Sequence, residues 1–243
     1  MKKKVLSIAL VAALIAIMVS GSLAYFTAED KVDNTFTIGS VLIDIYENGV
    51  ATPDAAKALG KLTPIVNTDD PSADENYMKK AVQVKNTGAN DAYIRTHIAI
   101  PTALVDYLQL EVPNPLAGWT FVGQTAASVG TEAMPYTVLT FDHTAAVKPG
   151  EFTSLLLQGV YLKPNVDLEE DAAGNLQFIL RDAQGNKTHS SGFVAHTKNT
   201  DGTYTSAVVN ILVASEAIQA QGFDSGATKA LDSGFGANTN PWQ

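Results

Sequence analysis

Short runs of alternating apolar and polar residues, separated by turn-forming Gly, Asn, Asp and Pro, fill most of the chain after residue 35. In "NTFTIGSVLIDIY" the apolar side chains occupy positions 36, 38, 41, 43 and 45, so the alternation changes phase across Gly39-Ser40. A β-bulge, which adds one residue to a strand, keeps both halves facing the same core. This stretch therefore predicts one strand with a bulge.

The same reading predicts several further strands. The segments 80–86 and 92–100, with turn-forming residues 86–91 between them, predict a hairpin. The segments 152–162 and 204–215 are apolar on both faces, which is typical of strands covered on both sides. Two more strands are expected in "LQFILRDAQGN" and "SGFVAHT". Many short strands at this spacing predict an all-β fold, an antiparallel jelly-roll-like β-sandwich, rather than alternating strands and helices.

Helices are expected to be few and short. Thr52-Pro53 begins a helical pattern that Gly60 ends, and a second pattern covers 225–235. Residues 102–133 have four prolines in their neighbourhood and are expected to form an elaborated loop that carries one strand.

The N-terminal region has the layout of a secretory signal peptide. A basic start at 1–4 precedes the apolar run Val5–Val19, and small residues at Ser22 and Ala24 favour cleavage between Ala24 and Tyr25. An uncleaved membrane anchor is the alternative, because the run has about the 20 residues that a spanning helix requires. The favoured prediction is a signal peptide at 1–24 and a secreted product with no membrane attachment.

Composition narrows the classes of partner. Removing residues 1–24 takes away three lysines and no acidic residue, so the formal net charge changes from −9 to −12. An acidic surface disfavours nucleic acid and anionic membranes as electrostatic partners. The chain has no cysteine, so it forms no disulfide and carries no lipid-modified cysteine.

No catalytic motif is present in the sequence. None of the four histidines (His97, His143, His189 and His196) is followed by Glu, so the zinc-protease pattern is missing. There is no Gly-x-Ser-x-Gly elbow, and Asp142-His143 has no identifiable serine partner. The prediction is that the protein is not an enzyme and has no catalytic, metal-binding or cofactor-binding residues.

Several polar residues have ordinary structural explanations. His97 is out of phase with the apolar residues of its strand, which predicts a solvent-facing or edge position. His189 and His196 could meet across a hairpin, but no third ligand is defined. The acidic groups at 69–70, 74–75 and 169–171 could offer oxygen ligands to calcium, but their spacing favours solvated turns.

Four stretches together resemble the TasA/camelysin family of secreted bacterial proteins. They are "AYFTAEDKVDNTFTIGSVLIDI" (24–45), "KLTPIV" (61–66), "VQVKNTGANDAYIRTHI" (82–98) and "EAIQAQGF" (216–223). The resemblance implies a jelly-roll-like sandwich that is the major fibre subunit of a biofilm matrix. It also implies a SipW-type signal peptidase as the processing enzyme.

The resemblance further implies that the segment freed by cleavage completes the sheet of the next subunit. Residues 25–37 are then the donor strand, and 38–243 form the sandwich domain. Tyr25 and Phe26 would provide aromatic anchors, with Val32 and Phe36 as further apolar anchors. Self-association gives a homopolymer, and other matrix proteins are a further class of partner.

Three alternatives stay open. The segment 25–37 could pair with its own chain as an edge strand or fray as a tail. The protein could be a secreted camelysin-like metalloprotease, although the sequence has no recognisable zinc motif. It could also be a non-polymerising surface adhesion module with Tyr107, Trp119 and Trp242 as a sugar platform; Trp119, however, is expected in the core.

Overall fold

A computed structural model describes residues 27–30, 41–51, 63–128, 134–223, 226–237 and 240–242, with only the backbone of 27–30. The predicted signal peptide, its Ala24–Tyr25 cleavage site and the predicted helix at 52–60 lie outside these residues. The proposed anchors Tyr25, Phe26, Val32 and Phe36 also lie outside them.

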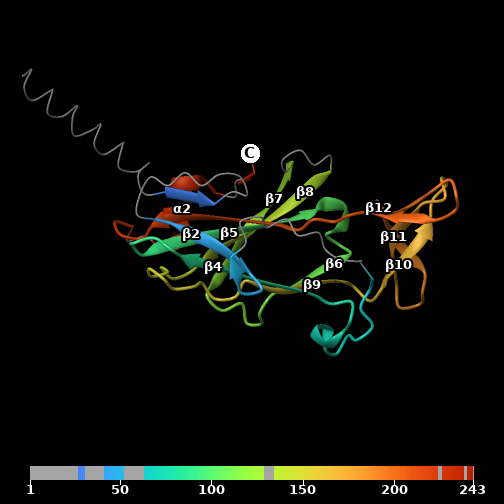
Figure 1. Cartoon of the computed structure of the whole chain (residues 1–243), viewed down its shortest axis with the longest axis horizontal. Helices are drawn as coiled ribbons and strands as arrows, with labels where there is room; N and C mark the ends of the chain where they lie inside the picture. Colours follow the sequence, from blue (N-terminus) through green and yellow to red (C-terminus); the bar gives the residue numbers. More distant parts are fainter. Residues whose placement is uncertain are drawn as a thin grey trace, which may run out of the picture.

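Two five-stranded antiparallel sheets form the body of the molecule (Figure 1). The first sheet has the order β1-β14-β5-β8-β7, with β1 Thr27–Asp30, β14 Leu212–Gln219, β5 Ala92–Pro101, β8 Pro135–His143 and β7 Trp119–Ser128. The second has the order β3-β2-β4-β9-β6, with β3 Val50–Ala51, β2 Ile43–Glu47, β4 Met78–Asn86, β9 Leu157–Leu162 and β6 Leu108–Glu111. The predicted all-β antiparallel sandwich is confirmed.

Apolar side chains from both sheets meet in one continuous core. Val82 and Val84 of β4 and Leu157 of β9 pack in the same cluster as Ile94 of β5 and Val213 of β14. Burial of this apolar surface is the main stabilising contribution, because apolar area removed from water contributes roughly 25 cal/mol per Å².

A third, four-stranded antiparallel sheet lies at one end of the molecule, on the right of Figure 1. Its order is β10-β11-β12-β13, with β10 Val166–Glu170, β11 Leu176–Arg181, β12 Lys187–Lys198 and β13 Tyr204–Ser206. The two strands expected at 176–186 and 191–197 correspond to β11 and to part of the longer β12. The run 204–215 is divided between β13 and β14, which belong to different sheets.

The predicted hairpin between 80–86 and 92–100 is wrong. Both strands exist, but β4 pairs with β2 and β9, whereas β5 pairs with β14 and β8. The connection 86–91 therefore crosses from one sheet to the other. The buried Asn86 side chain holds it, donating hydrogen bonds of 2.8 Å to the carbonyl oxygens of Asn90 and Val147.

Residues 102–133 contain more regular structure than the sequence predicted. A 3-10 turn, η2 (Thr102–Leu104), is followed by strands β6 and β7, so this region carries two strands where one was expected. A second 3-10 turn, η1 (Pro71–Ala73), lies before β4. The helix expected at 225–235 is present as α2 (Ala227–Phe235), which packs on β5 and β14.

Candidate assembly site

The segment that follows the predicted cleavage site begins the first sheet. Strand β1 pairs antiparallel with β14 in its own chain, with Thr27 opposite Ile218 and Asp30 opposite Ser215. Only four residues of β1 take part, whereas β14 has eight. In the structure of the single chain, this part of the segment 25–37 therefore pairs with its own chain as an edge strand, which is one of the alternatives left open by the sequence.

Strand β14 is fixed on its core face. Val213 and Ala217 belong to the central apolar cluster. Between them the hydroxyl groups of Ser215 and Thr96 of β5 form a hydrogen bond of 2.9 Å inside the core. The edge of β14 that faces β1 is thus part of a rigid, packed strand.

The outer face of this sheet is not exposed to solvent, because the C-terminal segment packs on it. Leu231 and Ala230 of α2 pack on Ile218 of β14, and Trp242 packs near Leu212 and Ala99. Every residue of β14 is consequently buried. The sequence predicted apolar residues on both faces of this strand, and the covering segment explains that pattern.

Arg95 forms a buried charged cluster beneath this cover. Its guanidinium donates to both carboxylate oxygens of Asp142 at 2.7 and 3.0 Å, and to Asp232 of α2 at 2.7 Å. It also donates to the carbonyl oxygen of Gly236 at 2.7 Å. Burial disfavours the charged form of Arg95, but the hydrogen bonds and charges of the two carboxylates outweigh this effect and raise its pKa. The cluster fastens the C-terminal helix to the sheet.

The predicted solvent-facing position of His97 is wrong. Its side chain is fully buried, 3.1 Å from the Thr140 hydroxyl and 3.3 Å from the Glu216 carboxylate. The ring of Trp242 lies edge-on to it at a centroid distance of 6.4 Å. His97 does point to the outer face, as its phase indicates, but the C-terminal segment occupies that face.

The structure brings a serine to His143, which the sequence did not reveal. The Ser154 backbone N–H donates to Nε2 of His143 at 3.3 Å, while Nδ1 lies 2.8 Å from the Ala145 carbonyl oxygen. The Ser154 hydroxyl donates instead to the Ala117 carbonyl oxygen at 2.6 Å. Because that proton is directed away from the imidazole, this geometry is a structural contact and not an activated nucleophile.

Burial lowers the pKa of His143, and the hydrogen bond with Ala145 opposes this shift only in part. Trp119 lies beside the imidazole at a centroid distance of 5.0 Å and is itself buried, so its expected place in the core is confirmed. Tyr107 is buried as well. These burials exclude Tyr107, Trp119 and Trp242 as a joint exposed sugar platform.

The remaining candidate metal ligands do not converge. Both His189 and His196 belong to the single strand β12, so they do not face each other across a hairpin, and His196 lies 3.0 Å from the Ser206 hydroxyl. Within the described part of the chain, no group of three or more His, Cys, Asp or Glu residues is placed to hold a metal ion.

The acidic groups are engaged in turns and surface ion pairs. Asp74 accepts backbone hydrogen bonds from Asn67, Asn76 and Val66, which lower its pKa. Asp171 caps a turn through the Asn175 and Ala173 amides, and its pKa is lowered for the same reason. For Asp74 and Asp171 these contacts match the turns expected from the sequence. Glu169 and Glu170 instead lie on β10 and form surface ion pairs with Lys187 and Lys198.

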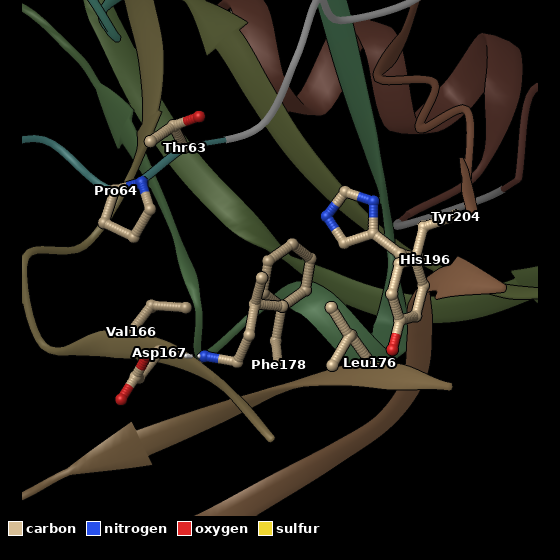
Figure 2. A pocket seen from close by; sticks show the side chains of 9 residues that line it. Thr63, Pro64, Val166, Asp167, Leu176, Phe178, His196 and Tyr204 are labelled. Carbon is tan, nitrogen blue, oxygen red and sulfur yellow. Dashed lines mark hydrogen bonds between the residues drawn. The ribbon is translucent and has the colours of Figure 1, made fainter. Parts of the chain in front are cut away.

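A pocket of about 450 Å³ lies between the third sheet and the chain at 63–64. Figure 2 shows the Phe178 ring near its centre, with Pro64 and Val166 on one side and His196 and Tyr204 on the other. Asp167 lies at its margin. Such a lining suits an apolar side chain or a small apolar molecule.

Comparisons with family models, with curated proteins and with solved structures give no match for this chain. No helix among the described residues is both long and apolar enough to cross a membrane.

Proposed function

We propose that this protein is a secreted structural subunit of an extracellular, biofilm-type matrix fibre. The subunits assemble when the N-terminal strand of one copy pairs with β14 of the next. The observation that carries this proposal is that β1, just after the predicted cleavage site, is a four-residue edge strand on an otherwise completely buried β14. The resemblance to the TasA/camelysin family supports the same function, with a jelly-roll-like arrangement of the sandwich.

Exchange of β1 between copies is energetically inexpensive. The same backbone hydrogen bonds form whether β1 belongs to the same chain or to a neighbour, as in domain swapping. Each such bond contributes only about 0.5–1.5 kcal/mol net, so four paired residues form a weak intramolecular latch. A high concentration of processed chains then favours pairing between copies.

Processing decides when exchange can begin. Residues 1–24 keep the N-terminus attached to an apolar segment until a signal peptidase of the SipW type cleaves after Ala24. Tyr25 then becomes the first residue of a free, extendable strand. The product is an acidic, secreted protein whose partners are other copies of itself and other matrix proteins.

The metalloprotease alternative has less support. The described residues contain no cluster suited to a metal ion. A serine hydrolase is disfavoured as well, because the Ser154 hydroxyl beside His143 is directed to a carbonyl oxygen. An adhesion function is supported only by the apolar pocket of Figure 2, whose lining identifies no specific ligand.

Electron microscopy of the processed protein tests the proposal. Protein that begins at Tyr25 is expected to form filaments, and a variant lacking Tyr25–Asp33 is expected to remain soluble without filaments. A synthetic peptide of residues 25–37 should stop filament growth, whereas a scrambled peptide of equal composition should not. Filaments of unchanged width from the shortened variant would exclude the proposed exchange.

A further inference from the structure

We infer that the pocket of Figure 2 binds a small, neutral, planar phenol. The rings of this ligand lie against the aromatic lining, and its hydroxyl group pairs with Nε2 of His196. The pocket is built by the third sheet and by the chain at 63–64. The inference therefore goes beyond the proposed fibre and does not depend on the exchange of β1.

The size of the pocket suits a free small molecule. Its volume of about 450 Å³ lies within the roughly 300–1,000 Å³ that is usual for small-molecule sites. This volume is larger than one aromatic side chain requires. A free ligand of two fused rings consequently fills it better than a single tyrosine inserted from another protein.

Fixed ring-shaped surfaces line the pocket. Figure 2 shows the Phe178 ring near its centre, between Pro64 on one side and His196 and Tyr204 on the other. Phe178 is only 2% exposed, and its ring stacks with that of Phe193 at a centroid distance of 6.2 Å, so it is held in place. Such surfaces favour a planar aromatic ligand, because rings pack well in offset-stacked or edge-to-face contacts.

One imidazole nitrogen is directed into this apolar space. His196 lies on β12, and its Nδ1 is 3.0 Å from the Ser206 hydroxyl of β13, which orients the ring. Figure 2 shows the other nitrogen, Nε2, pointing toward the space between Pro64 and the Phe178 ring. Within the described part of the chain, Nε2 has no hydrogen-bond partner. It is therefore available to a ligand.

The other polar side chains of the lining are already bonded or turned away. The Asp167 carboxylate accepts a hydrogen bond from Arg181 at 2.7 Å, and Figure 2 shows it pointing away from the central ring. The Tyr204 hydroxyl donates to the Gly174 carbonyl oxygen at 3.4 Å. The Thr63 hydroxyl also points away from the central ring in Figure 2. Nε2 of His196 is thus the polar atom that an enclosed ligand meets.

This arrangement favours a phenol over other classes of ligand. Among the nine lining residues there is no Lys or Arg to pair with an anion, and the charge of Asp167 is balanced by Arg181. A sugar would enclose several hydroxyl groups beside one polar atom and leave most of them unpaired. The Ser206 hydroxyl can donate to or accept from Nδ1, so Nε2 can be donor or acceptor; a phenolic hydroxyl pairs with either form.

Titration of the processed full chain with 2-naphthol at pH 7 tests this inference. The probe has two fused rings and one phenolic hydroxyl, and it is neutral at this pH because phenols ionise near pH 10. Naphthalene, with the same rings and no hydroxyl, is the matched ligand. We expect one 2-naphthol per chain, bound about fivefold more tightly than naphthalene, as one hydrogen bond predicts. The fluorescence of each probe measures its affinity.

Substitutions in the pocket supply the matched variants. His196→Phe keeps a ring but removes Nε2, so it should weaken 2-naphthol binding about fivefold without weakening naphthalene binding. His189→Phe makes the same change at an exposed position of the same strand and should affect neither ligand. Leu176→Trp fills the pocket and should abolish binding of both. Circular dichroism would verify that each variant is folded.

Several results would overturn the inference. One is the absence of saturable 2-naphthol binding, and another is binding that Leu176→Trp leaves intact. Equal affinities for the two probes, or an unchanged 2-naphthol affinity in His196→Phe, would exclude recognition of the hydroxyl group. Tighter binding of N-acetyltyrosinamide than of 2-naphthol would assign the pocket to a side chain of another protein. None of these results bears on filament formation, so the fibre proposal is tested separately.

Discussion

Arg95 is a fully buried arginine, and removing its charge from water costs a large amount of free energy. Arg95 has no exposed side-chain surface, so the cost of removing its charge from water must be offset by its partners. Asp142 provides two of the hydrogen bonds and is buried with it, whereas Asp232 is 36% exposed. The two carboxylates should therefore contribute unequally.

Replacing each carboxylate by its amide measures this difference. Asp142→Asn leaves a buried guanidinium without its bidentate partner, so we expect a loss of about 3–5 kcal/mol in the free energy of unfolding. Asp232→Asn should cost about 1 kcal/mol, because solvent screens the charge of this partly exposed carboxylate and the amide oxygen can still accept the hydrogen bond. Urea denaturation of both variants checks the order, and equal losses would contradict the assignment of Asp142 as the principal partner.

The buried His143 predicts a specific dependence of stability on pH. Its pKa in the folded protein is lowered from the ordinary value of 6.5, mainly by burial, so the unfolded chain binds the proton more strongly. Its stabilising contribution is complete above pH 6.5 and is lost as the pH falls from 6.5 toward the lowered pKa. Thermal unfolding between pH 7 and pH 5 should show a smaller decrease for His143→Gln than for the unsubstituted protein.

His189→Gln is the matched control, since His189 is exposed on β12. We expect it to keep the slope of the unsubstituted protein. An unchanged slope in His143→Gln would show that another group causes the loss of stability in this range.

At the scale of elements, the C-terminal segment covers the outer face of the first sheet, while the inner face packs against the second sheet. The sequence predicted α2 correctly, because its Gly-bounded helical pattern is local. It could not predict where α2 docks, since that depends on contacts such as Leu231 with Ile218 across the fold. For this reason alternation alone predicts a solvent-facing position for His97, whereas the docked C-terminal segment buries it.

The sequence also could not predict which strands pair with each other. Alternation identified β4 and β5, but the turn-rich connection 86–91 fits either a hairpin or a crossing between sheets. The hydrogen bond from Asn86 to Val147, 61 residues away, stabilises the crossing and has no local signal. In the candidate assembly site, the sequence indicated an N-terminal strand, whereas its four-residue register with β14 comes from the structure.

The docking of α2 can be tested by one core substitution. Leu231 is fully buried between the helix and the sheet, so Leu231→Ala should lower the free energy of unfolding by about 2–4 kcal/mol. Lys229→Ala, on the exposed side of the same helix, should change it by less than about 0.5 kcal/mol. Similar effects of the two substitutions in urea denaturation would mean that α2 does not pack as described.

At the scale of the whole molecule, the proposed assembly depends on how the edges of the sheets are used. The first sheet ends in the short strand β1 on one side and in the long, uncharged strand β7 on the other. If residues 1–24 are removed, the formal charge of −12 disfavours close approach of separate copies, so the proposed assembly depends on specific backbone pairing. The proposed fibre requires that β1 of one chain pairs with β14 of another.

Mixing two singly substituted proteins tests this claim most directly. Ala28 lies opposite Ala217, so Ala28→Cys on one chain and Ala217→Cys on another form a disulfide only when β1 of the first pairs with β14 of the second. Each protein would be processed separately, mixed under fibre-forming conditions and oxidised, with the doubly substituted chain as a control for pairing within one chain. The account predicts covalent dimers that contain one chain of each kind. A disulfide that forms only within the doubly substituted chain, with no dimer in the mixture, would contradict it.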